Sequence, residues 1–347
     1  MWQNRSKKFY ILVSVAVVLA VAVLIYFAFY FYKEKLAPGT SSPSETPALT
    51  ETLSEGFLIL SLRPGVENAT SSIYFYDLSK KELTFISDKN SLNINGHGLP
   101  SGIAVTSSRF LAATGTADEN IFQLYQVDMK NNFMKKQITN SRTFSKRHPE
   151  WSPNGKQIAF MAKSNLSKNA TSSNPDDWSV YVTDTKGNEK LLGPGSYPQW
   201  APDSKKLVAL RSDGLYLYDL EKQTSAKVWN MADGSAVLRM NIDVSRDGSM
   251  LAWSVPNDRQ IILAKISSWE PFEFKIYKTI DNILAFWPVF SPKAQYLAAI
   301  TVEEKENSTI NLYTTIYNIE TLEMQNLFNL NSFSVNSMTL TDWGGLK

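Results

Sequence analysis

The sequence contains no cysteine and only two histidines, His97 and His148. The absence of cysteine excludes disulfides, thiolate zinc sites and thiol nucleophiles. Two histidines cannot build a multi-histidine metal site, and without cysteine they leave few ligands for a mixed site. The H-E-x-x-H, P-loop, G-x-G-x-x-G and G-x-S-x-G patterns are also missing. The sequence therefore predicts no catalytic residues, no metal and no cofactor, in a protein that is not an enzyme.

A strong charge of one sign is missing from most of the chain. The formal net charge is +2, and the positive excess lies in the first 35 residues, so the remainder is slightly acidic. A nucleic-acid-binding domain carries a basic patch or stripe. The sequence therefore predicts no nucleic-acid partner.

One long apolar run is present near the N-terminus. Residues 9–32 carry no charge, and as a helix they would extend roughly 36 Å, enough to cross a bilayer. Basic residues in segment 1–8 favour a cytoplasmic N-terminus. Residues 33–55 are rich in Ser, Thr, Pro and Glu, which is typical of a flexible spacer. We expect a single-pass anchor in the cell membrane with the rest of the chain outside the cytoplasm; a cleaved signal peptide is the alternative.

Beyond residue 55 the sequence repeats itself. HPEWSPNGKQIAF at residues 148–160 returns as YPQWAPDSKKLVAL from Tyr197, as IDVSRDGSMLAW from Ile242 and as WPVFSPKAQYLAAI from Trp287. Equivalent aliphatic positions recur every 44 to 49 residues. Short alternating strands with a period in this range are typical of a propeller or a similar array.

Each unit contains two hairpin signals. Residues 152–155, Ser-Pro-Asn-Gly, match a type I turn, and the other units carry variants of it. A second turn follows a Tyr-rich strand and is opened by an acid or amide: Asp77, Asp128, Asp184, Asp219 and Asn318. Two hairpins in one unit predict a blade of four strands.

The ends of the repeat region predict how the array closes. Four-stranded units are expected to start near residues 101, 148, 197, 239 and 286. Residues 56–87 supply only three strands, and the C-terminal SMTLTDWGGLK supplies one more. We therefore expect an all-β, six-bladed β-propeller over residues 56–347, closed by the C-terminal strand, because each blade needs a neighbour to bury its faces.

The pattern aromatic-Pro-x-Trp-Ser-Pro-Asp/Asn-Gly-x-x-Ile/Leu-Ala-Phe resembles the TolB-like, WD40-like propeller repeat. The copies that begin at His148 and Tyr197 match well, those from Val244 and Trp287 moderately, and the copy near Gly102 poorly. The resemblance covers the propeller region and implies its fold. TolB itself has an α/β domain ahead of the propeller, where this chain has the apolar run and the spacer, so TolB's own partners are not carried over.

The loops that enter the first strands, with those that join strands two and three, are expected on one face around the central channel. They carry the candidate partner-binding residues Arg142, Arg147, His148, Trp178, Tyr197 and Trp287. Arginine mixed with aromatic residues suits a protein or glycan partner. The polar insertion at 163–178 belongs to the same face. The alternative is that His148, Tyr197 and Trp287 fill the channel mouth as a feature of the repeat.

These observations predict a membrane-anchored, extracytoplasmic propeller that acts as a protein–protein interaction module in an envelope or surface assembly. A propeller that binds a glycan or small ligand at the channel mouth is the alternative. A propeller enzyme is the least favoured hypothesis, because the sequence offers no catalytic set.

Overall fold

The computed structural model describes residues 56–64, 72–85, 91–98, 103–110, 121–164, 174–230, 241–304, 310–329 and 335–344. The predicted N-terminal segment, anchor and spacer, residues 1–8, 9–32 and 33–55, lie outside the described residues. Within the described ranges no helix is long and apolar enough to cross a membrane. All the described strands belong to the compact unit Leu49–Lys347.

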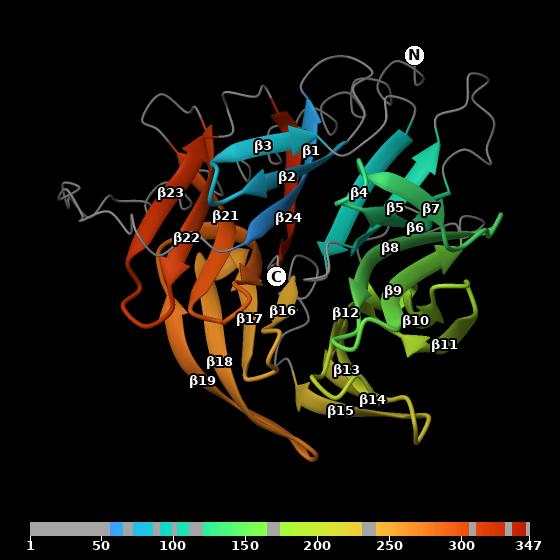
Figure 1. Cartoon of the computed structure of the whole chain (residues 1–347). Helices are drawn as coiled ribbons and strands as arrows, with labels where there is room; N and C mark the ends of the chain where they lie inside the picture. The colour runs from blue at the N-terminus through green and yellow to red at the C-terminus, as the bar shows by residue number, and fades with distance from the viewer. Residues whose placement is uncertain are drawn as a thin grey trace, which may run out of the picture. The chain divides into compact units, whose positions relative to one another are not determined.

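The described strands form six four-stranded sheets (Figure 1), numbered here in chain order and written from the inside outwards. The first sheet contains β24 (Val335–Gly344), β1 (Phe57–Pro64), β2 (Ser72–Asp77) and β3 (Glu82–Phe85). The second contains β4 (Ser91–Gly98), β5 (Ile103–Phe110), β6 (Gln123–Asp128) and β7 (Met134–Gln137). The third contains β8 (Phe144–Trp151), β9 (Gln157–Ser164), β10 (Ser179–Asp184) and β11 (Glu189–Pro194).

The remaining sheets repeat this order. The fourth contains β12 (Ser196–Trp200), β13 (Lys206–Arg211), β14 (Gly214–Asp219) and β15 (Thr224–Asn230). The fifth contains β16 (Ile242–Val244), β17 (Met250–Val255), β18 (Gln260–Trp269) and β19 (Phe272–Ile280). The sixth contains β20 (Leu284–Phe290), β21 (Tyr296–Glu304), β22 (Ile310–Asn318) and β23 (Met324–Asn329). Within the described ranges two 3-10 turns, η2 (Pro175–Asp177) and η4 (Pro256–Asp258), lie in loops.

The innermost strands make a closed circle. Strands β24, β4, β8, β12, β16 and β20 each contact the next in this order, and β20 contacts β24. The C-terminal strand β24 pairs antiparallel with β1, from Phe57 opposite Gly344 to Pro64 opposite Val335. The prediction that the C-terminus completes the first sheet is therefore confirmed, and the chain is an all-β propeller of four-stranded blades.

The turn residues behave as the repeat predicts. The amide of Gly155 donates to the Ser152 carbonyl at 2.8 Å, which closes the turn between β8 and β9. In the second hairpins, Asp77, Asp128, Asp184, Asp219 and Asn318 each accept from backbone amides two to four residues further on. One boundary was wrong: the second sheet begins with β4 at Ser91, and not near residue 101. This copy carries Gly98 where other copies carry Trp151, Trp200 or Phe290, so its first strand could not be aligned.

The core lies between the faces of neighbouring sheets. Val180 and Val182 of the third sheet pack against Trp200, Leu207 and Tyr218 of the fourth, and all of them are nearly inaccessible to water. Each such side chain contributes roughly 1.5–3 kcal/mol through burial. The strands carry apolar residues on both faces because each sheet packs against a neighbouring sheet on each side.

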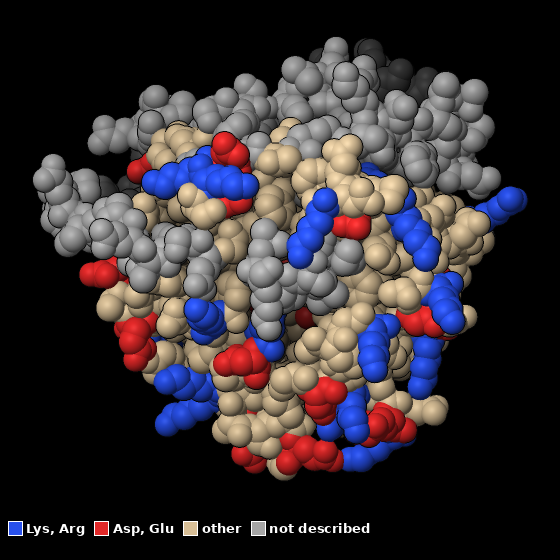
Figure 2. Space-filling view, in the orientation of Figure 1, with Lys and Arg blue, Asp and Glu red and all other residues tan. Residues whose placement is uncertain are grey.

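On the face seen in Figure 2, basic and acidic side chains are interspersed. One ion-pair cluster joins the fourth and fifth sheets, where Glu270 pairs with Lys206 at 3.0 Å and also with Lys222. The pair of Glu270 with Lys222 is exposed on both sides, so water and salt screen it and it contributes little to stability.

Candidate functional site

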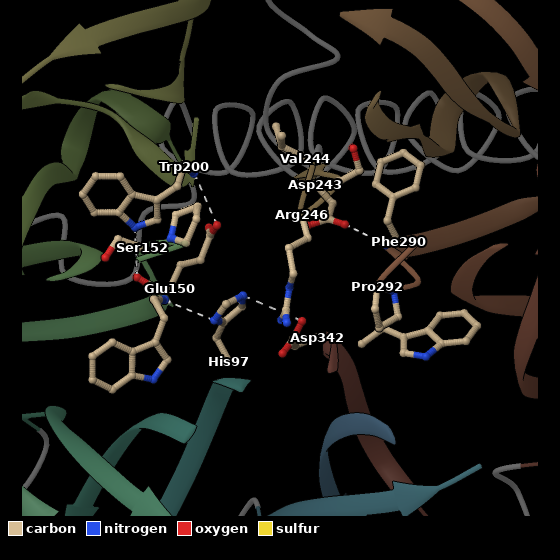
Figure 3. A pocket seen from close by; sticks show the side chains of 14 residues that line it. His97, Glu150, Ser152, Trp200, Asp243, Val244, Arg246, Phe290, Pro292 and Asp342 are labelled. Carbon is tan, nitrogen blue, oxygen red and sulfur yellow. Dashed lines mark hydrogen bonds and ion pairs between the residues drawn. The ribbon is translucent and has the colours of Figure 1, made fainter. Parts of the chain in front are cut away.

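A cavity of about 100 Å³ lies in the middle of the circle of innermost strands (Figure 3). Its charged and titratable lining residues are His97, Glu150, Asp243, Arg246 and Asp342. Its aromatic lining residues are Trp151, Trp200, Phe290 and Trp343. These residues lie at the carboxyl ends of the innermost strands or in the turns that follow, so we name this end of the channel the exit end.

The lining residues occupy one repeated position. The same place near the end of the innermost strand is held by His97 in β4, Glu150 in β8, Gln199 in β12, Asp243 in β16, Val289 in β20 and Asp342 in β24. Because the strands are equivalent and surround one axis, residues at the same position converge on the channel. We name these six residues the inner ring.

The inner ring makes five of the six links between neighbouring sheets through hydrogen bonds to backbone amides. The acceptors and donors are His97 Nδ1 with Trp151 N (3.1 Å), Glu150 Oε1 with Trp200 N (3.3 Å), Gln199 Oε1 with Val244 N (3.1 Å), Asp243 Oδ2 with Phe290 N (2.7 Å) and Asp342 Oδ2 with Gly98 N (2.7 Å). Val289 carries no acceptor and leaves the sixth link open. The polar side chains of the channel thus hold neighbouring blades together.

Arg246 crosses the channel from the turn between β16 and β17. It stands where the corresponding turns carry Pro153, Pro202 and Pro292. Its Nη2 donates to the carbonyl of Gly98 in the second sheet at 3.1 Å. In Figure 3 the inner-ring side chains labelled there lie around it. A single side chain therefore connects the fifth sheet to the opposite part of the circle.

Burial and repulsion between acids raise the pKa of two of the carboxyl groups. Burial and, to a smaller extent, the nearby Asp342 carboxylate raise the pKa of Asp243 to about 8. Burial, followed by the charge of Asp243, raises the pKa of Glu150 well above its usual value. Burial lowers the pKa of His97, which favours the neutral imidazole. At neutral pH Asp243 therefore retains a proton that could be exchanged.

Four polar atoms of the lining residues are buried without a hydrogen-bond partner: Oε2 of Glu150, Nη1 of Arg246, and the indole Nε1 atoms of Trp151 and Trp343. A buried polar group without a partner is costly, so such atoms mark a place for water or a ligand. Among the described residues no three histidine or carboxylate side chains converge as a metal site would require.

The six residues predicted from the sequence divide between surface and interior. Arg142 is exposed, just before the start of β8. Trp178 is only 7% exposed, and its ring lies 5.6 Å from the Arg147 guanidinium. The same guanidinium lies 5.2 Å from the ring of Phe122. Arg147 and Trp178 are therefore packed against each other inside the third blade.

The remaining three predicted residues share a backbone feature. His148, Tyr197 and Trp287 have φ values of 46°, 51° and 51°, and each lies at a break in the register of its innermost strand. The rings of His148 and Tyr197 meet at 4.5 Å, and burial lowers the pKa of His148 to about 3. Trp287 packs against the core between the first and sixth sheets. All three are partly buried.

The sequence analysis missed Glu150, Asp243, Arg246 and Asp342, and considered His97 only as a metal ligand. The signal was present, because these acids stand directly before the last residue or the turn of the innermost strand in each repeat. It was not recognised, since glutamate, glutamine, aspartate and valine at one position do not look alike.

No protein-family model matches the sequence. No curated protein matches it at a significant level. Among solved structures, TolB from Acinetobacter baumannii is similar, with a TM-score of 0.58 at 15% identity over 83% of this chain and 67% of that one. The periplasmic gluconolactonase of Pseudomonas aeruginosa has a TM-score of 0.50 at 9% identity, over 82% of this chain and 99% of that one. At these identities the similarity shows the fold, a β-propeller.

Proposed function

We propose that the chain is a membrane-anchored, extracytoplasmic propeller that binds a protein partner in an envelope or surface assembly. The binding surface lies at the end of the channel where the innermost strands begin, which we name the entry face. In this proposal the apolar run at residues 9–32 is the membrane anchor. The spacer at residues 33–55 lets the propeller reach a partner at some distance from the membrane.

The observation that carries this proposal is an exposed arginine beside an exposed aromatic ring. Arg142 is exposed, and Phe144, at the first position of β8, keeps 38% of its surface accessible. Arginine and large aromatic side chains are enriched where proteins bind each other. Tyr197 and Trp287 are partly buried and pack against the cores between sheets.

The chemistry of the channel agrees with a binding role. Carboxyl oxygens of Glu150, Asp243 and Asp342 accept hydrogen bonds from backbone amides of the next sheet. A general base must instead reach a proton of the substrate. These acids are positioned by the architecture of the ring, which favours a rigid binding module over an enzyme.

The test is a crosslinked pull-down of the tagged full-length chain from its native membrane. The variant is Arg142→Ala/Phe144→Ala. The matched control is Lys275→Ala/Ile276→Ala on the outermost strand β19, which also removes one exposed cation and one exposed apolar side chain.

A stoichiometric protein that the variant loses and the control retains supports the proposal. A protein retained by both variants contradicts the assigned surface. If no protein is captured while a glycan array shows binding that depends on Arg142 and Phe144, the module binds glycans and the protein-partner proposal is wrong.

A further inference from the structure

The cavity at the exit end is distinct from the proposed protein-binding surface. Its residues lie at the carboxyl ends of the innermost strands, whereas Arg142 and Phe144 lie where β8 begins. A ligand in this cavity would therefore be a second function of the ring, independent of the entry face.

The lining combines acidic and aromatic side chains. Carboxyl groups come from Glu150, Asp243 and Asp342, against the single guanidinium of Arg246. Indole and phenyl rings come from Trp151, Trp200, Phe290 and Trp343. Carboxylates attract a cation by charge, so a wall with three carboxyl groups and one guanidinium favours a cation.

The geometry of this wall is fixed in advance. One oxygen of each carboxyl group accepts from the next sheet, at 3.3 Å for Glu150 and 2.7 Å for Asp243. The second oxygen of Glu150 is buried and has no partner. A donor with several N–H groups placed in the cavity would satisfy it without disturbing the ring.

Charge balance favours a monocation. Burial lowers the pKa of His97 and raises the pKa of Glu150, and Asp243, with a pKa of about 8, retains its proton at neutral pH. A ligand with one positive charge can enter if one of these carboxyl groups gives up its proton to solvent. The net charge of the cavity is then unchanged, and one proton appears in solution for each ligand bound.

We propose that the cavity at the exit end binds a primary ammonium group, held by the carboxyl groups of Glu150 and Asp243. A cavity of about 100 Å³ exceeds the space needed by one water and accepts a group of a few non-hydrogen atoms. The ammonium belongs either to a free small amine or to a lysine side chain inserted by a partner.

The experiment is calorimetric titration of the full-length chain at pH 7 with methylammonium and, separately, with Nα-acetyl-lysine amide. Repetition in two buffers of different ionisation enthalpy gives the number of protons released. The variants are Glu150→Gln and Asp243→Asn, singly and together; each keeps an amide oxygen for the backbone link, and Gln199 shows that glutamine occupies this position in the fourth sheet. The control is Asp258→Asn, an exposed carboxylate in η4.

We expect saturable binding with close to one proton released, and affinity roughly tenfold to hundredfold weaker in the double variant while the control is unchanged. Tighter binding of methylammonium identifies a free amine as the source, and tighter binding of the lysine amide identifies a side chain. Absence of binding by both probes, or binding that Glu150→Gln and Asp243→Asn leave intact in folded protein, overturns the proposal. The Arg142→Ala/Phe144→Ala variant should bind ammonium normally, so failure here and failure of the protein-partner proposal can be told apart.

Discussion

Replacement of Asp342 by alanine should destabilise the propeller more than any exposed carboxylate change, because it opens the junction between the first and second sheets. Asp342 is only 8% exposed, and its Oδ2 accepts from the amide of Gly98 at 2.7 Å. Alanine leaves that buried N–H without an acceptor. A lost hydrogen bond to a charged group, with an orphaned buried donor, costs about 2–3 kcal/mol.

For a domain of this size, that loss lowers the melting temperature by roughly 4–10 °C. Asp342→Asn keeps an acceptor oxygen of the same shape and should cost under about 1 kcal/mol. The assay is thermal and denaturant unfolding of both variants followed by circular dichroism, at equal scan rates. An alanine variant within about 0.5 kcal/mol of the parent would refute the view that the inner ring supports closure. Equal losses in both variants would assign the effect to the charge and not to the hydrogen bond.

Three further predictions concern other parts of the structure. The pKa of Asp243 in the folded protein is about 8, above its ordinary value of 3.8. Its contribution to stability is therefore complete below about pH 4 and is lost as the pH rises through 8. The melting temperature should fall over that interval, and it should fall less in Asp243→Asn. Gly98→Ala should cost about 1–3 kcal/mol in denaturant unfolding, since its Cβ would lie 3.0 Å from the buried ring of Phe57, and no loss would show that the ring moves freely. Glu270→Gln, which breaks an exposed pair with Lys222, should change the melting temperature little, and 1 M salt should remove the difference from the parent; a large, salt-independent loss would contradict this.

The inner ring explains why the channel residues differ from sheet to sheet. Glutamate, glutamine, aspartate and histidine all place an acceptor within reach of the next amide, so the link tolerates several side chains. The sixth sheet uses Val289 instead, which packs into the core between the first and sixth sheets. Closure of the ring therefore does not require an acid at Glu150 or Asp243. Their carboxyl groups make the lining of the cavity acidic.

Much of the architecture could be predicted from local signals. The period of 44 to 49 residues, the Ser-Pro-Asn-Gly turn at 152–155 and the turn-opening acids specify four-stranded units, because turn geometry and strand alternation depend on nearby residues. The lone strand at the C-terminus implied pairing with the first sheet, which the register of β24 with β1 confirms.

The location of the cavity depended on the tertiary structure. Residues separated by 244 positions, Gly98 and Asp342, meet only when the circle closes. The sequence also did not reveal which side chains are exposed to solvent. Trp178 and Trp287 are residues of a type that is common in binding surfaces, but they lie partly or wholly inside the blades. The sequence by itself determined the repeated unit and its turns, because these follow from short-range backbone chemistry. Only the closed ring decided which side chains share the channel, since that depends on contacts between sheets far apart in the chain.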